Sequence, residues 1–132
     1  MAAPSRRAHI RILCDHPAEV FLGTMTGRRL GDGRLLDVSF SGAYLSIDAD
    51  LQNGTPYRLR LKDAEGSWEP AFRVVREGAR HPKRPFSRNY GILFSLSAEQ
   101  ERRWSRLVDE MRRHPTDQET RLDRSLRGYW SG

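Results

Sequence analysis

Residues 57–62 read Tyr-Arg-Leu-Arg-Leu-Lys, so apolar and basic side chains alternate with a period of two. Successive side chains of a β-strand point to opposite faces, and the pattern therefore predicts a strand with one buried face and one face in water. The dipeptide Asn53-Gly54, which is typical of tight turns, precedes this strand. The stretch sets the expectation of a β fold.

Short apolar segments continue on both sides of this strand, from residue 18 to about residue 95. Further strands are predicted around residues 20–22, 30–38, 43–47, 68–75 and 90–94. Gly31-Asp32-Gly33 is interpreted as a turn signal, and Pro70 predicts a sheet edge or a bulge. Because the strands are short and closely spaced, with no room for crossover helices, the sequence predicts an antiparallel barrel or sandwich.

A helix is predicted after the last strand. Ser97 and Gln100 have the spacing of a capping box, in which each side chain bonds the backbone N–H of the other residue. Apolar residues then follow at i, i+3, i+4 and i+7: Trp104, Leu107, Val108 and Met111. They form one stripe, which we expect to cover the barrel, and Pro115 ends the helix.

These patterns divide the 132 residues into three parts. Residues 1–16 are expected to form a flexible basic N-terminal arm, because they show little periodicity. Residues 17–113 are expected to form the barrel and its helix. Residues 114–132 form a C-terminal tail, which we interpret either as a short second helix docked on the body or as a partner-binding segment.

The charge of the chain is strongly basic, with a net charge of +6 that comes almost entirely from arginine. The guanidinium group suits phosphate and purine recognition better than lysine does. No apolar run approaches the length of a membrane span, and the first residues do not resemble a signal peptide, so we expect a soluble cytoplasmic protein. Cys14 is the single cysteine, and no cluster of metal ligands accompanies it, so neither a disulfide nor a metal site is expected.

Two short motifs carry the functional information. Arg7 and Arg11 form an R-x-x-x-R pair, preceded by Arg6. Asp37, Ser39 and Gly42 form a D-x-S-x-x-G motif between two predicted strands. Taken separately, the first reads as a solvated basic terminus, and the second as a hairpin turn in which Gly42 adopts a positive φ.

Taken together, the two motifs suit a planar ligand with two negative charges. An arginine fork can bind a phosphate or the O6 and N7 edge of guanine, and it can stack on a purine face. An ionised aspartate accepts hydrogen bonds from the N1–H and N2–H₂ groups of guanine. Backbone N–H groups at a turn suit an anion.

The chain resembles the PilZ domain family, which binds the bacterial second messenger cyclic di-GMP. The resemblance rests on the two motifs, on their order and separation, and on Tyr90-Gly-Ile-Leu-Phe94, which looks like the closing strand of that family. It covers roughly residues 5–112. It implies a six-stranded antiparallel β-barrel with a C-terminal α-helix.

The resemblance also implies a function and a site. The ligand would be cyclic di-GMP, bound on the outer surface of the barrel with the arm folded over it, and a partner protein would read the moved arm in motility or biofilm regulation. No cofactor is implied. The ligand-binding residues would be Arg6, Arg7, Arg11, Asp37, Ser39 and Gly42.

Two alternatives remain open at this stage. The first is a degenerate PilZ-type scaffold that acts by protein–protein contacts in motility or pilus machinery without binding the ligand. The second is a nucleic-acid-binding barrel, suggested by the basic charge and by Tyr57 near Arg58 and Arg60, although no RNA-binding signature accompanies them. An enzyme is not expected, because no Ser/His/Asp set or metal cluster has a suitable spacing. The basic loop with Arg80, Lys83 and Arg84 either extends the anion site or is solvated.

Overall fold

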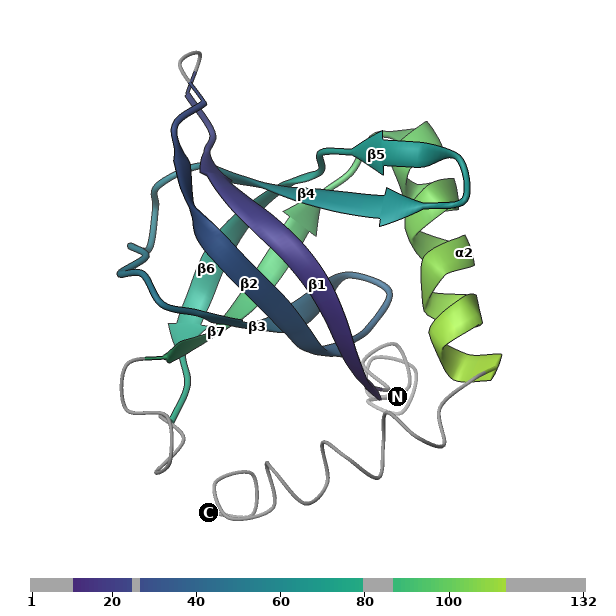
Figure 1. The fold of residues 1–132 in the computed structure, drawn as a ribbon, viewed down its shortest axis with the longest axis horizontal. Helices are drawn as coiled ribbons and strands as arrows, with labels where there is room; N and C mark the ends of the chain where they lie inside the picture. The colour runs from purple at the N-terminus through teal and green to yellow at the C-terminus, as the bar shows by residue number, and fades with distance from the viewer. Residues whose placement is uncertain (1–10, 25–26, 80–86, 114–132) are drawn as a thin grey trace, which may run out of the picture.

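The computed structural model describes residues 11–24, 27–79 and 87–113, and Figure 1 shows their arrangement. The strands are β1 (Ile12–Leu22), β2 (Arg29–Val38), β3 (Gly42–Ile47), β4 (Tyr57–Asp63), β5 (Gly66–Trp68), β6 (Ala71–Glu77) and β7 (Arg88–Ser95). One helix follows them, α2 (Ala98–Arg113).

Six of the strands form a closed antiparallel barrel. Their order is β1-β2-β3-β7-β6-β4, and pairing between β1 and β4 closes the ring. The short strand β5 pairs with β4 outside this ring. Closure gives nearly every strand two neighbours, which leaves little exposed edge. The predicted fold class, a six-stranded antiparallel barrel with a C-terminal helix, is confirmed.

The strand predicted at residues 57–62 is present as β4, with one face buried and the other facing outward. Tyr57, Leu59 and Leu61 are at most 3% exposed and belong to the core, while Arg58 and Arg60 lie on the opposite face. Pro70 lies between β5 and β6, so the single strand predicted around residues 68–75 is divided into two. The Pro70 carbonyl accepts a hydrogen bond from the backbone N–H of Leu59 at 3.0 Å.

Gly31-Asp32-Gly33 is not a turn, which corrects the prediction. The three residues lie inside β2, and the chain reverses before β2 begins. Gly31 has a φ of 155° beside a register shift between β1 and β2. A Cβ atom on Gly33 would lie 2.9 Å from a methyl group of Leu45. These glycines therefore serve a bulge and close packing rather than a turn.

The barrel begins earlier than predicted. β1 starts at Ile12, so residues 12–16 belong to a strand and not to the arm. Ile12 and Cys14 are buried, and the Cys14 thiol donates a hydrogen bond to the carbonyl of Leu35 at 3.2 Å. A register shift between Leu13 and His16 breaks the regular alternation, which hid this part of the strand in the sequence. Residues 1–10 lie outside the described residues.

Helix α2 has the predicted cap and the predicted buried stripe. The backbone N–H of Gln100 donates to the Ser97 hydroxyl at 3.2 Å, and the backbone N–H of Ser97 donates to the Gln100 side chain at 3.1 Å. All four stripe residues are buried. Arg103 holds the helix against the β4–β5 hairpin through two hydrogen bonds to Asp63, at 3.0 and 2.7 Å, and Figure 1 shows the two elements side by side.

The predicted tail at residues 114–132 lies outside the described residues. Within the part of the chain that the structure describes, no helix combines the length and the apolar character needed to cross a membrane. Over the same residues, the acidic, histidine and cysteine side chains form no group of three or more that could hold a metal ion.

Candidate functional site

The D-x-S-x-x-G motif lies at the tight turn between β2 and β3, as predicted. The backbone N–H of Ser39 donates to the carbonyl of Gly42 at 2.9 Å, and the N–H of Gly42 donates to the Ser39 hydroxyl at 3.2 Å. The indole N–H of Trp104 donates to the Ser39 carbonyl at 2.8 Å. The Ser41 carbonyl accepts from the N–H of Phe94 at 3.0 Å. The turn is therefore held by its own bonds, by the helix and by β7.

Gly42 does not have the positive φ that the sequence suggested, and this expectation is wrong. It begins β3, where it pairs with Leu93 of β7. A Cβ atom at this position would lie 2.2 Å from the carbonyl oxygen of Ile92. The glycine is required because the backbones of β3 and β7 approach each other closely, which leaves no space for a side chain.

Asp37 lies near the end of β2 and is 3% exposed. Its carboxylate is 3.6 Å from the guanidinium of Arg11, which is half exposed. Burial raises the pKa of Asp37 to about 6, although the positive charges of Arg11 and Arg76 act to lower it. A poorly hydrated carboxylate of this kind forms strong hydrogen bonds with any donor that reaches it.

Four of the six predicted ligand residues line one pocket of about 140 Å³: Arg11, Asp37, Ser39 and Gly42. The other two, Arg6 and Arg7, lie outside the described residues, as do Arg80, Lys83 and Arg84 of the basic loop. The structure thus brings together one arginine of the first motif and all three residues of the second.

The sequence analysis missed one charged and one aromatic side chain that also line this pocket. Arg76 of β6 and Tyr44 of β3 line it together with the motif residues. The guanidinium of Arg76 lies 5.4 Å from the centre of the Tyr44 ring, within range of a cation–π contact. Because of a register shift between Val74 and Arg76, the alternation of buried and exposed residues along β6 does not predict which face Arg76 lies on. Gly91 was the available signal, because a glycine inside a strand often marks the close approach of another group.

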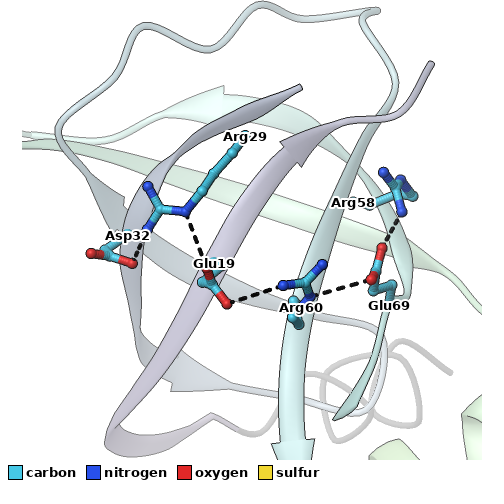
Figure 2. Close-up of polar contacts among 6 residues, drawn as sticks. All are labelled: Glu19, Arg29, Asp32, Arg58, Arg60 and Glu69. Atoms are coloured by element: carbon cyan, nitrogen blue, oxygen red, sulfur yellow. Dashed lines mark hydrogen bonds and ion pairs between the residues drawn. The ribbon is translucent and has the colours of Figure 1, made fainter. Parts of the chain in front are cut away.

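The two arginines of β4, Arg58 and Arg60, lie on a surface that is separate from this pocket. Figure 2 shows a chain of ion pairs in which Arg29, Glu19, Arg60, Glu69 and Arg58 follow one another across the outer face of the barrel. The Nε atom of Arg29 is 3.0 Å from Glu19, and that of Arg60 is 3.3 Å from Glu69. Arg60 also lies over the ring of Phe21, at 4.5 Å. Acidic partners therefore neutralise the basic side chains of this face.

A larger hollow, of about 650 Å³, borders this charged face and contains Glu19, Asp32, Arg34 and Arg60. Arg34 pairs with Asp15, and Arg60 pairs with Glu19. No residue of either motif lines the hollow among the described residues. The smaller pocket at the β2–β3 turn is therefore the candidate ligand site.

Comparison with known proteins agrees with this geometry. The PilZ domain family matches residues 5–110. No curated protein matches the sequence. Among solved structures, the PilZ domain of YcgR from Escherichia coli with c-di-GMP is similar, with a TM-score of 0.63 and 18% identity over 83% of this chain and 93% of that chain.

Two other solved structures have the same fold. The PilZ domain of CeSA from a cellulose-synthesizing bacterium has a TM-score of 0.58 and 24% identity, over 78% of this chain and 98% of that chain. MrkH, a c-di-GMP-dependent transcription regulatory factor, has a TM-score of 0.54 and 15% identity, over 76% and 48% of the two chains. Because the family match spans most of the sequence, the chain belongs to the PilZ domain family.

Proposed function

We propose that this chain is a non-catalytic receptor for cyclic di-GMP, and that it binds the ligand at the pocket beside the β2–β3 turn. The observation that carries the proposal is the meeting of the two motifs, in which Arg11 lies 3.6 Å from Asp37. Ser39 and Gly42 line the same pocket. The proposal is further supported by the related PilZ domain of YcgR, which was solved with c-di-GMP.

The chemistry assigns a role to each motif residue. Asp37 accepts hydrogen bonds from the Watson–Crick edge of a guanine, since its carboxylate is acceptor-only when ionised. Arg7 and Arg11 supply contacts to the guanine edge, the purine face and the phosphates. Arg6 adds a phosphate contact or positive field, Ser39 bonds a phosphate or the arm, and Gly42 permits close approach.

The size of the pocket suggests how the ligand is held. Pockets that enclose a drug-sized molecule measure roughly 300–1,000 Å³, and the pocket at the turn measures about 140 Å³. It is therefore large enough for only part of a cyclic dinucleotide. The arm, which joins the barrel at Arg11, would cover the remainder, and its changed position would be read by a partner protein.

Isothermal titration calorimetry of the full chain with cyclic di-GMP tests this function. We expect saturable binding that is lost or strongly weakened in Arg7→Ala and in Asp37→Ala. Arg28→Ala is the matched control, because it removes one positive charge from an exposed residue at the β1–β2 hairpin. Absence of binding, or equal affinity in all variants, would contradict the proposal and leave the degenerate PilZ-type scaffold.

The nucleic-acid alternative loses one of its two supporting observations, the aromatic residue among the arginines, while the basic charge of the chain remains. Tyr57 is 3% exposed and stacks on Phe72 in the core, with ring centres 5.5 Å apart. It therefore offers no platform for a base. Its neighbours Arg58 and Arg60 pair with Glu69. A gel-shift assay with single-stranded DNA and RNA should accordingly detect no salt-sensitive binding by this face.

A further inference from the structure

The candidate site includes a cation that neither motif contains. Four residues on neighbouring strands pair in one row: Asp37 with Tyr44, Tyr44 with Gly91, and Gly91 with Arg76. On three of the four strands, the residue next to the row belongs to the core: Val38, Leu45 and Ile92. Arg76 itself is exposed. Because adjacent side chains of a strand point to opposite faces, the row lies on the outer surface of the barrel.

Two bulges bring the charged ends of this row to the outer face. In β2 the register shifts between Leu35 and Asp37, and in β6 it shifts between Val74 and Arg76. Leu35 and Val74 point into the core, so a regular strand would direct Asp37 and Arg76 inward as well. Each bulge inserts one residue and reverses the direction of the next side chain. The two irregularities thus place an acid and a base on the same surface.

Gly91 provides the space that Arg76 occupies. A Cβ atom on Gly91 would lie 3.0 Å from Cγ and 3.1 Å from Nε of Arg76. The arginine stem therefore crosses β7 directly above the glycine and reaches the ring of Tyr44, 5.4 Å from the guanidinium carbon. This packing fixes the stem while the residue as a whole remains exposed.

The electrostatic relationships support a role in anion binding. The charges of Arg11 and Arg76 both act on Asp37 and lower its pKa against the effect of burial. With two cations and one carboxylate, this part of the pocket carries a net positive charge. Arg11 lies where the arm joins the barrel, whereas Arg76 is held within a strand of the barrel. Its forked guanidinium matches the geometry of a phosphate group.

We propose that Arg76 is a third arginine of the ligand site and that it binds a phosphate of the cyclic dinucleotide from the barrel side, independently of the arm. This inference rests on the proposed function. The stem of Arg76 is already positioned by Gly91 and Tyr44, so its guanidinium would need no rearrangement of the barrel to bind the phosphate.

Calorimetry with cyclic di-GMP at low and high NaCl concentration tests the inference. Loss of a charge-assisted contact predicts that Arg76→Ala binds about tenfold more weakly, or worse. It also predicts a weaker dependence of affinity on salt, since a charge–charge contact is screened. Arg76→Lys should retain part of the affinity, and Arg28→Ala should stay within about twofold of wild type, because its charge is remote.

Several results would overturn the inference while leaving the proposed function intact. One is wild-type binding together with an Arg76→Ala affinity within about twofold of wild type. Another is weaker binding with an unchanged salt dependence, which would indicate a contact other than phosphate. If wild type itself fails to bind, the proposed function fails instead. If Arg76→Ala does not fold, Arg76→Gln can replace it in the calorimetry, because glutamine keeps most of the stem and removes the charge. In addition, the NMR resonance of the Arg76 Nε–H group should shift when wild type is titrated with cyclic di-GMP.

Discussion

The indole N–H of Trp104 donates a hydrogen bond to the backbone carbonyl of Ser39, with 2.8 Å between the two atoms. The two residues are 65 positions apart in the sequence. Trp104 is 1% exposed and packs against Phe94, with ring centres 4.6 Å apart. The buried stripe of α2 thus supports the turn that carries Ser39, and the helix contributes to the geometry of the site as well as to the core.

Trp104→Phe should weaken this support while it keeps an aromatic ring in the core. The Ser39 carbonyl loses its donor from the helix, so we expect the free energy of unfolding to fall by roughly 1–3 kcal/mol. We also expect weaker binding of cyclic di-GMP, because the turn is less well held. Urea denaturation and calorimetry measure the two effects.

Trp68→Phe is the matched control for this substitution. Trp68 is 6% exposed, and its buried indole nitrogen has no hydrogen-bond partner among the residues that the structure describes. The substitution therefore makes a similar change in ring size but breaks no such bond. Equal losses of ligand affinity in the two variants would show that the contact between Trp104 and Ser39 does not support the site.

Gly42→Ala should disrupt the pairing of β3 with β7. The new methyl group would lie 2.2 Å from the carbonyl oxygen of Ile92, which belongs to a backbone that cannot move alone. We expect a loss of about 1–3 kcal/mol or more in the free energy of unfolding. Gly54→Asn is a suitable control, since Gly54 has a φ of 84° and open space around it, and asparagine tolerates that conformation. If Gly42→Ala is as stable as wild type, the close approach of the strands is not a constraint.

The structural features that were predicted correctly are those marked by local patterns in the sequence. The alternation at residues 57–62 and the capping box at Ser97 are local patterns, and both have the predicted structure. The D-x-S-x-x-G motif was placed at a turn between two strands, also correctly. These features depend on neighbours in the sequence, so the residues themselves contain the information.

The features that were missed depend on contacts between strands. The bulge before Arg76 reverses the direction of that side chain, and only the register with β7 reveals it. Gly42 was assigned a positive φ because glycine is frequent in turns, whereas the approach of β7 is what requires it. The start of β1 at Ile12 was hidden by a similar register shift near Leu13. Contacts between strands that are far apart in the sequence produce no periodic pattern in it, so sequence analysis could not predict these features.

Asp37 should make the stability of the ligand-free protein depend on pH. Its pKa rises from an ordinary value of 3.8 to about 6 in the folded chain. The folded state therefore binds the proton more tightly than the unfolded state, and stability falls as the pH rises from about 4 to about 6. Above this range the penalty is complete, on the order of 3 kcal/mol.

Asp37→Asn tests this dependence, because it keeps the shape of the side chain and removes the ionisation. We expect the variant to be more stable than wild type at pH 7, with a difference that shrinks toward pH 4 in urea denaturation. Binding should change in the opposite direction, because the ionised carboxylate is the proposed acceptor for guanine, so the variant should lose affinity at pH 7. A stability difference that is equal at both pH values would contradict the raised pKa.

Gly91→Ala offers a test of Arg76 in which no charge is changed. The added methyl group would lie 3.0–3.1 Å from the Arg76 stem, which must move by a small amount. Alanine is better than glycine in a strand, so stability should be unchanged or slightly higher. Affinity for cyclic di-GMP should nevertheless fall, because the guanidinium is displaced from the row that contains Asp37. Combined with Arg76→Ala, the substitution should have no further effect on affinity, since coupled residues are not additive. If Gly91→Ala weakens binding equally in both backgrounds, the glycine acts on the ligand directly and Arg76 is not the reason for its presence.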